Sequence, residues 1–357
     1  MRAVLPFAFV LCAAPAVAYA AACTATLKAD GNTAAVQRAM DKPGRRPVVC
    51  LKPGVYSGAR LSASRDVTLR GVGKGKVILD AGGRGRVLSI TDRGLNVRLE
   101  QLVLTNGDIE DGGALALLAD SHVQLTDCWL TANRAARKGG GLYANAGRLD
   151  LERTRISSNY GASGGAILLE GDATMAMNHS MISDNRNEAG SNGPIWLAGG
   201  TTLNLQHSTL AYNVGHGVYL RPAPRGPMPQ LRVESAIIMG SPDAIFVPRS
   251  RARAVTVFRS VLHGGIGFIA LDLASSRAIP RFNLTDLERY RPTRGSPAIA
   301  LGQCKRRQRD IAGRPRPKVC TAGALEAMPG DVKITLVERH KQALADKKKR
   351  EALGSPW

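Results

Sequence analysis

The segment SGGAILLEGD, residues 163–172, places two glycines before a short apolar run that ends in acidic residues. Two similar segments precede it, DGGALALLAD at 111–120 and KGGGLYANAG at 138–147. Consecutive copies are separated by 27 and 25 residues. Repetition at this interval indicates that each copy forms one turn of a solenoid and that the turns share one continuous core.

The sequence around these copies follows one template from residue 97 onward. Each repeat has an apolar reference residue and a second apolar residue five positions later. The reference residues are Leu99, Leu125, Leu151, Met177, Leu205, Val233 and Val257. Their apolar partners are Leu104, Leu130, Ile156, Ile182, Leu210, Ile238 and Leu262. The period-2 alternation predicts strands, and the spacing of 24 to 28 residues is typical of one coil of a parallel β-helix.

Small and polar residues also recur at fixed positions of the template. The eighth position after the reference residue holds Asn133, Asn159, Asn185 and Asn213, and Asn106 comes one residue early. Asparagine tolerates a left-handed backbone and bonds neighbouring peptide groups, so we interpret this row as a structural corner. Cys128 occupies the third position, which holds small residues in the other repeats. It is therefore interpreted as a buried structural thiol rather than a nucleophile.

The composition is that of a folded, strongly basic protein. The chain has 357 residues, 44% of them apolar, which is enough to fill a core and excludes general disorder. Thirty-nine glycines and only 4% aromatic residues suit a fold with many tight corners. A formal charge of +21 favours acidic partners, which include uronate polysaccharide, lipopolysaccharide phosphate, anionic membrane and nucleic acid. Charge alone does not choose among them.

The N-terminus has the features of a secretory signal. Arg2 precedes the apolar stretch AVLPFAFVLCAAPAVAYA, and Ala18 and Ala20 fit the rule for cleavage near Ala20 or Ala22. No later segment is apolar for long enough to span a membrane. We therefore expect an exported, soluble monomer in the periplasm or outside the cell. Lipidation at Cys23 is the alternative, although the leucine usual three residues upstream is absent.

Five cysteines remain after cleavage, in an oxidising compartment. The most economical pairs are Cys23 with Cys50 and Cys304 with Cys320, one at each end of the chain.

Two further stretches carry a family resemblance. Residues 29–58, ADGNTAAVQRAMDKPGRRPVVCLKPGVYSG, resemble the entry segment of pectate-lyase-like right-handed β-helix proteins. Residues 296–326 are similar to the C-terminal module of exported bacterial β-helix proteins called choice-of-anchor repeat proteins. The matching positions are Asp310, Gly313, Pro315, Arg316, Pro317, Cys320, Gly323, Ala324 and Glu326, while Ala300 stands where aspartate is usual. The resemblance implies a fold that hosts lyases, hydrolases, adhesins and binding proteins alike.

The expected fold is therefore all-β, a right-handed single-stranded parallel β-helix of about eight to ten coils with a capping helix and a helical tail. The expected organisation is a signal peptide at 1–20, an N-terminal cap and first coil at 23–65, β-helix repeats at 66–295, a disulfide-closed C-terminal module at 296–326 and a basic helical tail at 327–357.

Aromatic residues concentrate on one predicted strand row. In the resembling enzymes the substrate cleft follows the sheet called PB1, which here is the apolar run after the glycines. Alternation places six side chains outward on this sheet: Ala116, Tyr143, Leu168, Trp196, Tyr219 and Phe246. Four are aromatic, although the chain has only 3 Trp, 7 Tyr and 6 Phe. An exposed aromatic row can stack on sugar rings; the alternative is that loops or the tail cover it as ordinary packing.

A second outward row contains the polar candidates. Asn145, Glu170 and Arg221 would orient a sugar chain beside the aromatic residues. Glu170 and Arg221 are two coils apart and would be the catalytic pair if the protein were an enzyme. Solvated surface charges are the other interpretation of this pair.

Other carboxylates offer little for catalysis or metal binding. Asp108, Glu110 and Asp111 share one loop and could hold a weak Ca²⁺, but the outward rows of the sheet after the glycines offer Glu170 as their only carboxylate, so we expect no metal or cofactor. Glu110 and Asp111 are also four coils from His216, too far for shared acid and base chemistry.

We therefore expect binding of an anionic polysaccharide or cell-envelope glycan along the aromatic row, without nucleic acid as a partner because the export signal removes the chain from it. One alternative is a polysaccharide lyase or glycoside hydrolase. The other is a structural surface protein or adhesin that presents the loops at 134–138 and 186–193.

Overall fold

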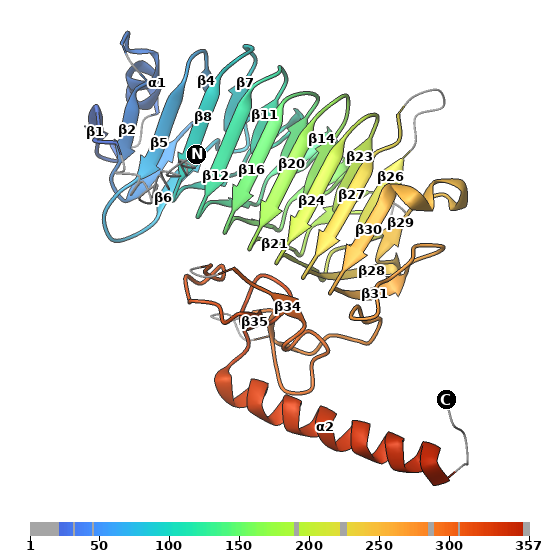
Figure 1. The fold of residues 1–357 in the computed structure, drawn as a ribbon. Helices are drawn as coiled ribbons and strands as arrows, with labels where there is room; N and C mark the ends of the chain where they lie inside the picture. The colour runs from blue at the N-terminus through green and yellow to red at the C-terminus, as the bar shows by residue number, and fades with distance from the viewer. Residues whose placement is uncertain are drawn as a thin grey trace, which may run out of the picture.

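The computed structural model describes residues 21–30, 33–44, 46–188, 193–221, 227–284, 289–305 and 308–352. The predicted signal peptide, residues 1–20, and the last residues of the predicted tail lie outside these ranges. The protein is mostly β and forms a parallel β-solenoid of about nine turns, as the repeats predict. Figure 1 shows the stacked strands running from blue to yellow, with the C-terminal segments in orange and red beside their far end.

Three parallel sheets form the walls of the solenoid. Sheet A contains β1 (Ala25–Leu27), β2 (Val48–Leu51), β5 (Val67–Gly71), β8 (Asn96–Glu100), β12 (His122–Thr126), β16 (Arg148–Glu152), β20 (Thr174–Asn178), β24 (Thr202–Gln206), β27 (Gln230–Glu234) and β30 (Val255–Phe258). Sheet B contains β3 (Gly54–Ser57), β6 (Val77–Asp80), β9 (Val103–Thr105), β13 (Trp129–Thr131), β17 (Arg155–Ser157), β21 (Met181–Ser183), β25 (Thr209–Ala211), β28 (Ile237–Asp243) and β31 (Val261–Gly265).

Sheet C follows the glycine pairs and is bordered by a shorter sheet. Sheet C contains β4 (Leu61–Ala63), β7 (Leu88–Ile90), β11 (Leu115–Leu117), β15 (Leu142–Ala144), β19 (Ile167–Leu169), β23 (Ile195–Ala198), β26 (Val218–Arg221) and β29 (Ile245–Phe246). Sheet D lies in the loops that lead into sheet C and contains β10 (Asp108–Asp111), β14 (Arg134–Lys138), β18 (Tyr160–Ser163) and β22 (Arg186–Asn187).

The register of the sheets confirms the template. In sheet A, Leu99 pairs with Leu125, Leu125 with Leu151, and the remaining reference residues continue this column to Val257. Their partners form an equivalent column in sheet B. Side chains of both columns are almost completely buried in one core. Burial of each large apolar side chain contributes about 1.5–3 kcal/mol, so the columns are the main source of stability.

The asparagine row stabilises a corner through the expected bonds to neighbouring peptide groups, whereas the expected left-handed backbone is found at Asn106 alone among the five asparagines. The side-chain Nδ2 of Asn159 donates to the Leu130 carbonyl at 3.0 Å and to Asn185 Oδ1 at 3.0 Å. Asn159 Oδ1 in turn accepts from the peptide N–H of Asn133 at 3.0 Å. The left-handed residues are those just before these asparagines, for example Ser158 at φ 57°, whereas Asn106 is itself left-handed. The asparagines therefore hold the corner through side-chain bonds.

Cys128 lies where the template places it. Its side chain is 2% exposed and contributes to the core. Burial raises the pKa of the Cys128 thiol to about 12. The thiol therefore stays protonated and serves as a small buried side chain.

The glycine pairs that open the repeats are required by close backbone approach. Gly164 has φ 65°, and a Cβ there would lie 2.3 Å from the Ile167 carbonyl oxygen. A Cβ on Gly165 would lie 2.3 Å from the Arg186 carbonyl oxygen of the next coil. The first glycine of each pair thus folds the loop back over sheet C, and the second allows adjacent loops to stack.

Both ends of the solenoid are covered, which hides strand edges that would otherwise pair with other chains. Helix α1 (Ala34–Asp41) places Val36 and Met40 on the first coils, and a disulfide joins Cys23 to Cys50. At the other end, Ile266 and Ile269 close the core beyond β31, near the 3-10 helix η1 (Arg249–Ala254). The strands of the solenoid thus end at Gly265, before the boundary expected at 295.

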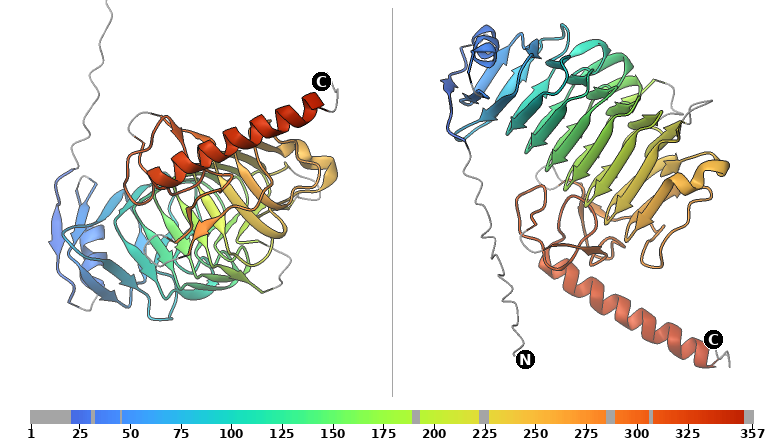
Figure 2. Two further views of the ribbon diagram at one scale, coloured as in Figure 1. Left: turned by 90° about the horizontal axis from the view of Figure 1, so that it is seen from below. Right: turned by 45° about the horizontal axis from the view of Figure 1, so that its top comes forward.

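Residues 289–305 and 308–327 pack against the outer face of sheet B. They include the module expected at 296–326, and we call them the C-terminal module from here on. The module contains β33 (Arg291–Pro292), which pairs with β32 (Phe282–Asn283), and β34 (Gly302–Gln303), which pairs with β35 (Val319–Cys320). Its apolar residues contact the outward side chains of β21, β25, β28 and β31. Figure 2 shows the module beside the coils and helix α2 (Pro329–Ala352) extending from it. Among the described residues no helix is both long and apolar enough to cross a membrane.

Several of the residues singled out between 296 and 326 in the sequence hold this loop region together. Asp310 is completely buried, and its Oδ1 accepts from the peptide N–H groups of Ala312 at 2.9 Å and Arg314 at 2.8 Å. The guanidinium of Arg316 donates to Glu326 at 3.1 Å. A disulfide joins Cys304 to Cys320. These residues are internal to the module and shape its backbone.

Two stacked histidines lie beneath the module at the corner between sheets A and B. The rings of His179 and His207 are 4.9 Å apart and nearly parallel. The Sγ of Cys304 lies 3.8 Å from the His207 ring nitrogens. Burial, reinforced by the positive charge of Arg316, lowers the pKa of both histidines to about 3. Both rings are therefore neutral at physiological pH.

We predict that Gly164→Ala destabilises the protein more than Gly82→Ala. Both glycines have positive φ, but only Gly164 has backbone atoms within contact distance of an added Cβ. The left-handed conformation alone costs an alanine about 1–2 kcal/mol. Urea unfolding should show a larger loss of stability for Gly164→Ala by at least about 1 kcal/mol. Equal losses would contradict the close approach.

We predict that acid destabilises the fold through the histidine stack. Because the folded pKa is about 3 and the ordinary value is 6.5, the unfolded state binds more protons between these values. Stability should thus be complete above pH 6.5 and decrease as the pH falls, by about 1.4 kcal/mol per pH unit for each histidine. The free energy of unfolding measured in urea from pH 6.5 to 4.5 should vary less in His207→Phe. His263→Phe serves as the control, and an unchanged slope in His207→Phe would refute the assignment.

Candidate functional site

The predicted outward row forms one column on sheet C. Tyr143 pairs with Ala116 and Leu168, Leu168 with Trp196, Trp196 with Tyr219, and Tyr219 with Phe246. The strand pairing therefore brings side chains from six coils into register. The column divides into a covered half and a half-exposed half.

The first half of the column is covered by the loops of sheet D. Tyr143 is 6% exposed and Leu168 is 3% exposed. A Cβ on Gly164 would lie 3.1 Å from the Leu168 Cβ, which shows how closely the loop crosses the strand. The Lys138 ammonium lies 5.3 Å from the Tyr143 ring centroid. Tyr143 is therefore packed beneath its own loops and presents no ring face to a ligand.

The second half consists of Trp196, Tyr219 and Phe246, which we call the aromatic row. All three are half-buried. The Tyr219 and Phe246 rings stack at 4.8 Å with an angle of 4°, and the Trp196 ring is tilted at 5.1 Å from Tyr219. Tyr219 and Phe246 therefore cover one ring face of each other, whereas Trp196 is not stacked face to face on Tyr219. No further strand of sheet C follows β29 in the described chain, so Phe246 ends the row.

Polar groups flank the aromatic row. The Arg221 guanidinium lies 5.7 Å from the Trp196 ring centroid, a cation–π contact. The His216 ring packs 5.0 Å from Phe246, and its Nδ1 lies 3.0 Å from Asp243 Oδ2. His216 occupies the position that the second glycine holds in the earlier pairs. Its imidazole therefore lies where the earlier loops have no side chain.

The structure gives Glu170 and Arg221 separate partners. Glu170 accepts from the Tyr143 hydroxyl and pairs with Lys138 Nζ at 2.7 Å. Burial and the bond to this carboxylate raise the pKa of Tyr143 well above its ordinary value. Arg221 instead lies over Trp196. Glu170 thus contacts the covered half of the column, and Arg221 contacts the half-exposed half. Asn145 is exposed in the turn after β15.

The acidic loop considered for calcium is paired with arginines. Arg137 lies 3.1 Å from Glu110 and 2.8 Å from Asp111, and Arg134 lies 4.0 Å from Asp108. These arginines belong to β14, the neighbouring strand of sheet D. The three carboxylates are therefore used in ion pairs between coils.

One group of residues has the donor atoms for a metal. Ring nitrogen and sulfur atoms of His207, Cys304 and Cys320 lie within 4.8 Å of one another. The two sulfurs are bonded to each other as a disulfide. In this state they are not thiolates, which is the form that binds metal ions.

The sequence analysis missed a cluster of carboxylates on sheet A. Glu100, Asp150 and Glu152 line a hollow of about 240 Å³ on the outer face of three neighbouring strands. Burial raises the pKa of Glu152 above its ordinary value, while Asp150 lies 2.7 Å from His122 Nε2. Two carboxylates held in different environments are a feature that glycoside hydrolysis uses, although Glu152 here also pairs with Arg153 at 3.1 Å. Alternation along the sheet A strands is the sequence signal that places these residues outward.

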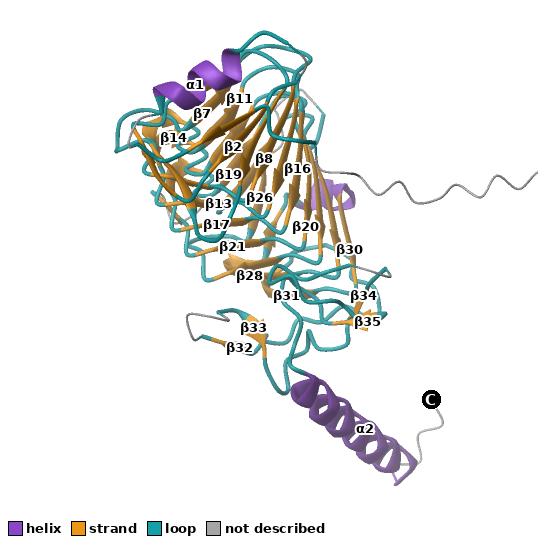
Figure 3. Cartoon of the chain, turned by 90° about the vertical axis from the view of Figure 1, so that its left-hand side faces the viewer, coloured by secondary structure: helices purple, strands orange, loops and turns teal. Residues whose placement is uncertain are grey.

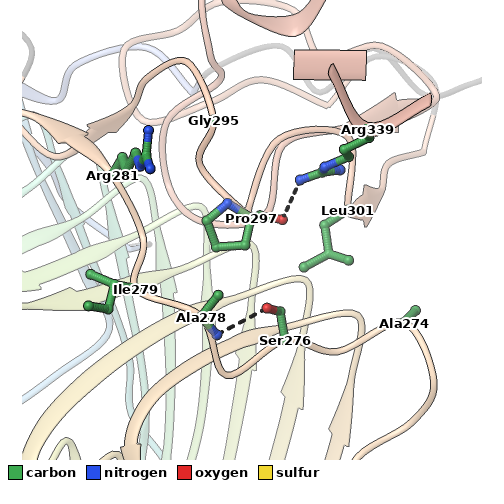
Figure 4. Close-up of a pocket in the computed structure, with 9 residues that line it drawn as sticks. All are labelled: Ala274, Ser276, Ala278, Ile279, Arg281, Gly295, Pro297, Leu301 and Arg339. Atoms are coloured by element: carbon green, nitrogen blue, oxygen red, sulfur yellow. Dashed lines mark hydrogen bonds between the residues drawn. The ribbon is translucent and has the colours of Figure 1, made fainter. Parts of the chain in front are cut away.

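A hollow of about 690 Å³ lies between the end of the solenoid and the C-terminal module (Figure 4). Arg281 and Arg339 lie on its walls with apolar residues such as Ile279 and Leu301. Arg339 donates to the carbonyl oxygens of Ser296, Pro297 and Ile299 at 2.8–3.1 Å. Its guanidinium therefore joins helix α2 to the module.

Comparison of the chain with protein-family models, with curated proteins and with solved structures found no significant match. Its function must be argued from the geometry of its own surfaces.

Proposed function

We propose that this chain is an exported protein that binds an acidic polysaccharide across the aromatic row, and that it is a member of the pectate-lyase-like β-helix proteins with a choice-of-anchor type module. The observation that carries the binding proposal is the alignment of Trp196, Tyr219 and Phe246 on three successive coils with Arg221 beside them. Export is supported by the signal-like N-terminus and by two disulfides, which suit an oxidising compartment.

The chemistry of the row suits a sugar chain with acidic groups. The half-buried Tyr219 and Phe246 rings and the partly exposed indole offer apolar contact to sugar C–H groups. Arg221 can leave its exposed cation–π contact at small cost and form two parallel hydrogen bonds to a carboxylate. A net charge of +21 draws acidic polymers to the surface in general. We therefore expect the aromatic row to supply contact area and Arg221 to supply charge recognition.

Binding is expected without cleavage. Glu170 pairs with Lys138 and Tyr143, and no described contact joins it to Arg221. The carboxylates of Glu100, Asp150 and Glu152, which have differing environments, lie on sheet A, away from the aromatic row. Lyase or hydrolase activity remains the second candidate because of this sheet A cluster, in which the pKa of Glu152 is raised by burial.

We predict that Trp196→Ala and Arg221→Gln each weaken binding of alginate oligomers by about fivefold to tenfold, because each removes a central contact of the row. Titration calorimetry at low and moderate salt measures this effect. Tyr143→Phe should leave affinity unchanged, since Tyr143 is covered, and it is the matched aromatic control. Native affinity in both row variants would refute the proposed site.

The same incubations distinguish binding from cleavage. New reducing ends, or unsaturated ends that absorb ultraviolet light, would show that the protein cuts the polymer. Loss of such ends in Glu152→Gln, but not in Glu170→Gln, would locate the acid on sheet A.

A further inference from the structure

A furrow follows the edge of the C-terminal module where it meets sheet B. It consists of three hollows of about 270, 210 and 450 Å³. The first two share Trp129 and Arg155, and the last two share Ser158, Asp184 and Arg289, so the hollows adjoin one another. We call this surface the module furrow. Figure 3 shows β13, β17 and β21 following one another along sheet B toward the module.

The walls of the furrow come from two parts of the chain. The outer faces of β13 and β17 form one wall, on which Trp129 and Arg155 occupy neighbouring positions of the same column. Ile311 and Tyr290 of the module form the other wall. Tyr290 is fixed by hydrogen bonds from its hydroxyl to Asp184 Oδ1 at 2.8 Å and Oδ2 at 3.0 Å. The furrow is therefore built by the docking of the module on the solenoid.

Trp129 forms a fixed aromatic platform in the middle of the furrow. Its indole N–H donates to Ser157 Oγ at 2.8 Å, which holds the ring in one orientation. The ammonium of exposed Lys76 lies 4.9 Å from the ring centroid. An exposed cation–π contact contributes only about 0.5–1 kcal/mol, so a ligand can displace Lys76 from the ring and then pair with it.

The charges that line the furrow are unbalanced. Its cations are Lys76, Arg153, Arg155, Arg186 and Arg289, and its carboxylates are Asp127 and Asp184. Arg153 pairs with Asp127 at 2.8 Å, and Arg289 pairs with Asp184 at 3.3 Å. Lys76, Arg155 and Arg186 form no ion pair within 4.0 Å anywhere in the described chain.

These three cations are distributed along the whole furrow. Lys76 lies at the first hollow, Arg155 between the first and second, and Arg186 at the third. Arg186 pairs in register with Tyr160, and Arg134 covers the Tyr160 ring at 4.5 Å. Partial burial lowers the pKa of Arg155, while the negative charge of Asp310 acts in the opposite direction. An anionic group placed against Arg155 would offset the cost of this burial.

We propose that the module furrow binds one linear acidic polysaccharide chain, with a sugar ring against Trp129 and its acidic groups paired with Lys76, Arg155 and Arg186. Neighbouring coils are about 4.8 Å apart, and Lys76, Arg155 and Arg186 belong to different coils, so a chain that crosses the coils meets these cations in succession. One fixed aromatic platform suits a sugar chain better than single-stranded nucleic acid, which uses aromatic rings under successive bases. The furrow shares no residue with the aromatic row on sheet C, so either site can exist without the other.

The test uses the full chain, with two kinds of furrow variant and a matched control. Trp129→Ala removes the platform, and the double variant Lys76→Gln with Arg186→Gln removes two exposed charges. The control double variant, Lys28→Gln with Arg251→Gln, removes the same amount of positive charge at exposed positions outside the furrow. The probes are alginate oligomers, neutral cello-oligosaccharides of equal length, and a dT oligomer. All variants are also made in the Trp196→Ala, Arg221→Gln background, in which only the furrow should bind.

In that background we expect alginate binding to persist and to weaken at least about fivefold in each furrow variant. The salt dependence of binding should become shallower in the charge variant, whereas the control double variant and the neutral sugar should show no such change. Native affinity in both furrow variants would overturn the proposal, as would tighter binding of the dT oligomer than of alginate. The exposed charge variant keeps the test decisive if Trp129→Ala proves unstable.

Discussion

Stacking of equivalent residues on successive coils is the constraint on which the structure depends. A parallel coil satisfies its backbone groups only through its neighbours, so a shift of register would expose a whole column at once. The columns that begin at Leu99 and Leu104 remain in register up to Val257 and Leu262. The same repetition that fills the core also places outward side chains in columns. Both candidate binding surfaces use that geometry, since the aromatic row lies on successive coils and one wall of the furrow is formed by paired positions of β13 and β17.

The regular part of the fold could be predicted from the sequence because each residue of the template pairs with the equivalent residue of the next coil. The pairing of Leu125 with Leu151 can be predicted from the repeat alone, without knowledge of distant segments. The same holds for the hydrogen bond between Asn133 and Asn159. The detail of the corner was not readable, because left-handed backbone falls on Ser158 and its equivalents and leaves no distinct residue pattern. Tyr143 illustrates a different limit. Alternation correctly places it outward, but only the path of the preceding loop determines that it is covered.

The aromatic row was predictable to the level of register, whereas the orientation of its rings was not. Whether Tyr219 and Phe246 offer faces or edges depends on how they pack against each other and His216. The module furrow was beyond sequence reasoning for another reason. Trp129 and Arg155 look like unrelated strand residues until Ile311 and Tyr290, more than a hundred positions later, form the opposite wall. The docking of irregular segments is not encoded in any short-range periodicity.

The C-terminal module makes the two ends of the solenoid differ in how firmly their coils are held. Tyr290 bonds to Asp184, Ala324 to Thr209 and Gly323 to Ser235, so one compact unit fastens three successive coils near the C-terminal end. The opposite end has α1 and the bond between Cys23 and Cys50. In a chain whose turns contact only their neighbours, loosening begins at the less fastened end and travels inward. Local unfolding should therefore start at the early coils. The coils bound by the module should stay folded and serve as the template on which the early coils refold.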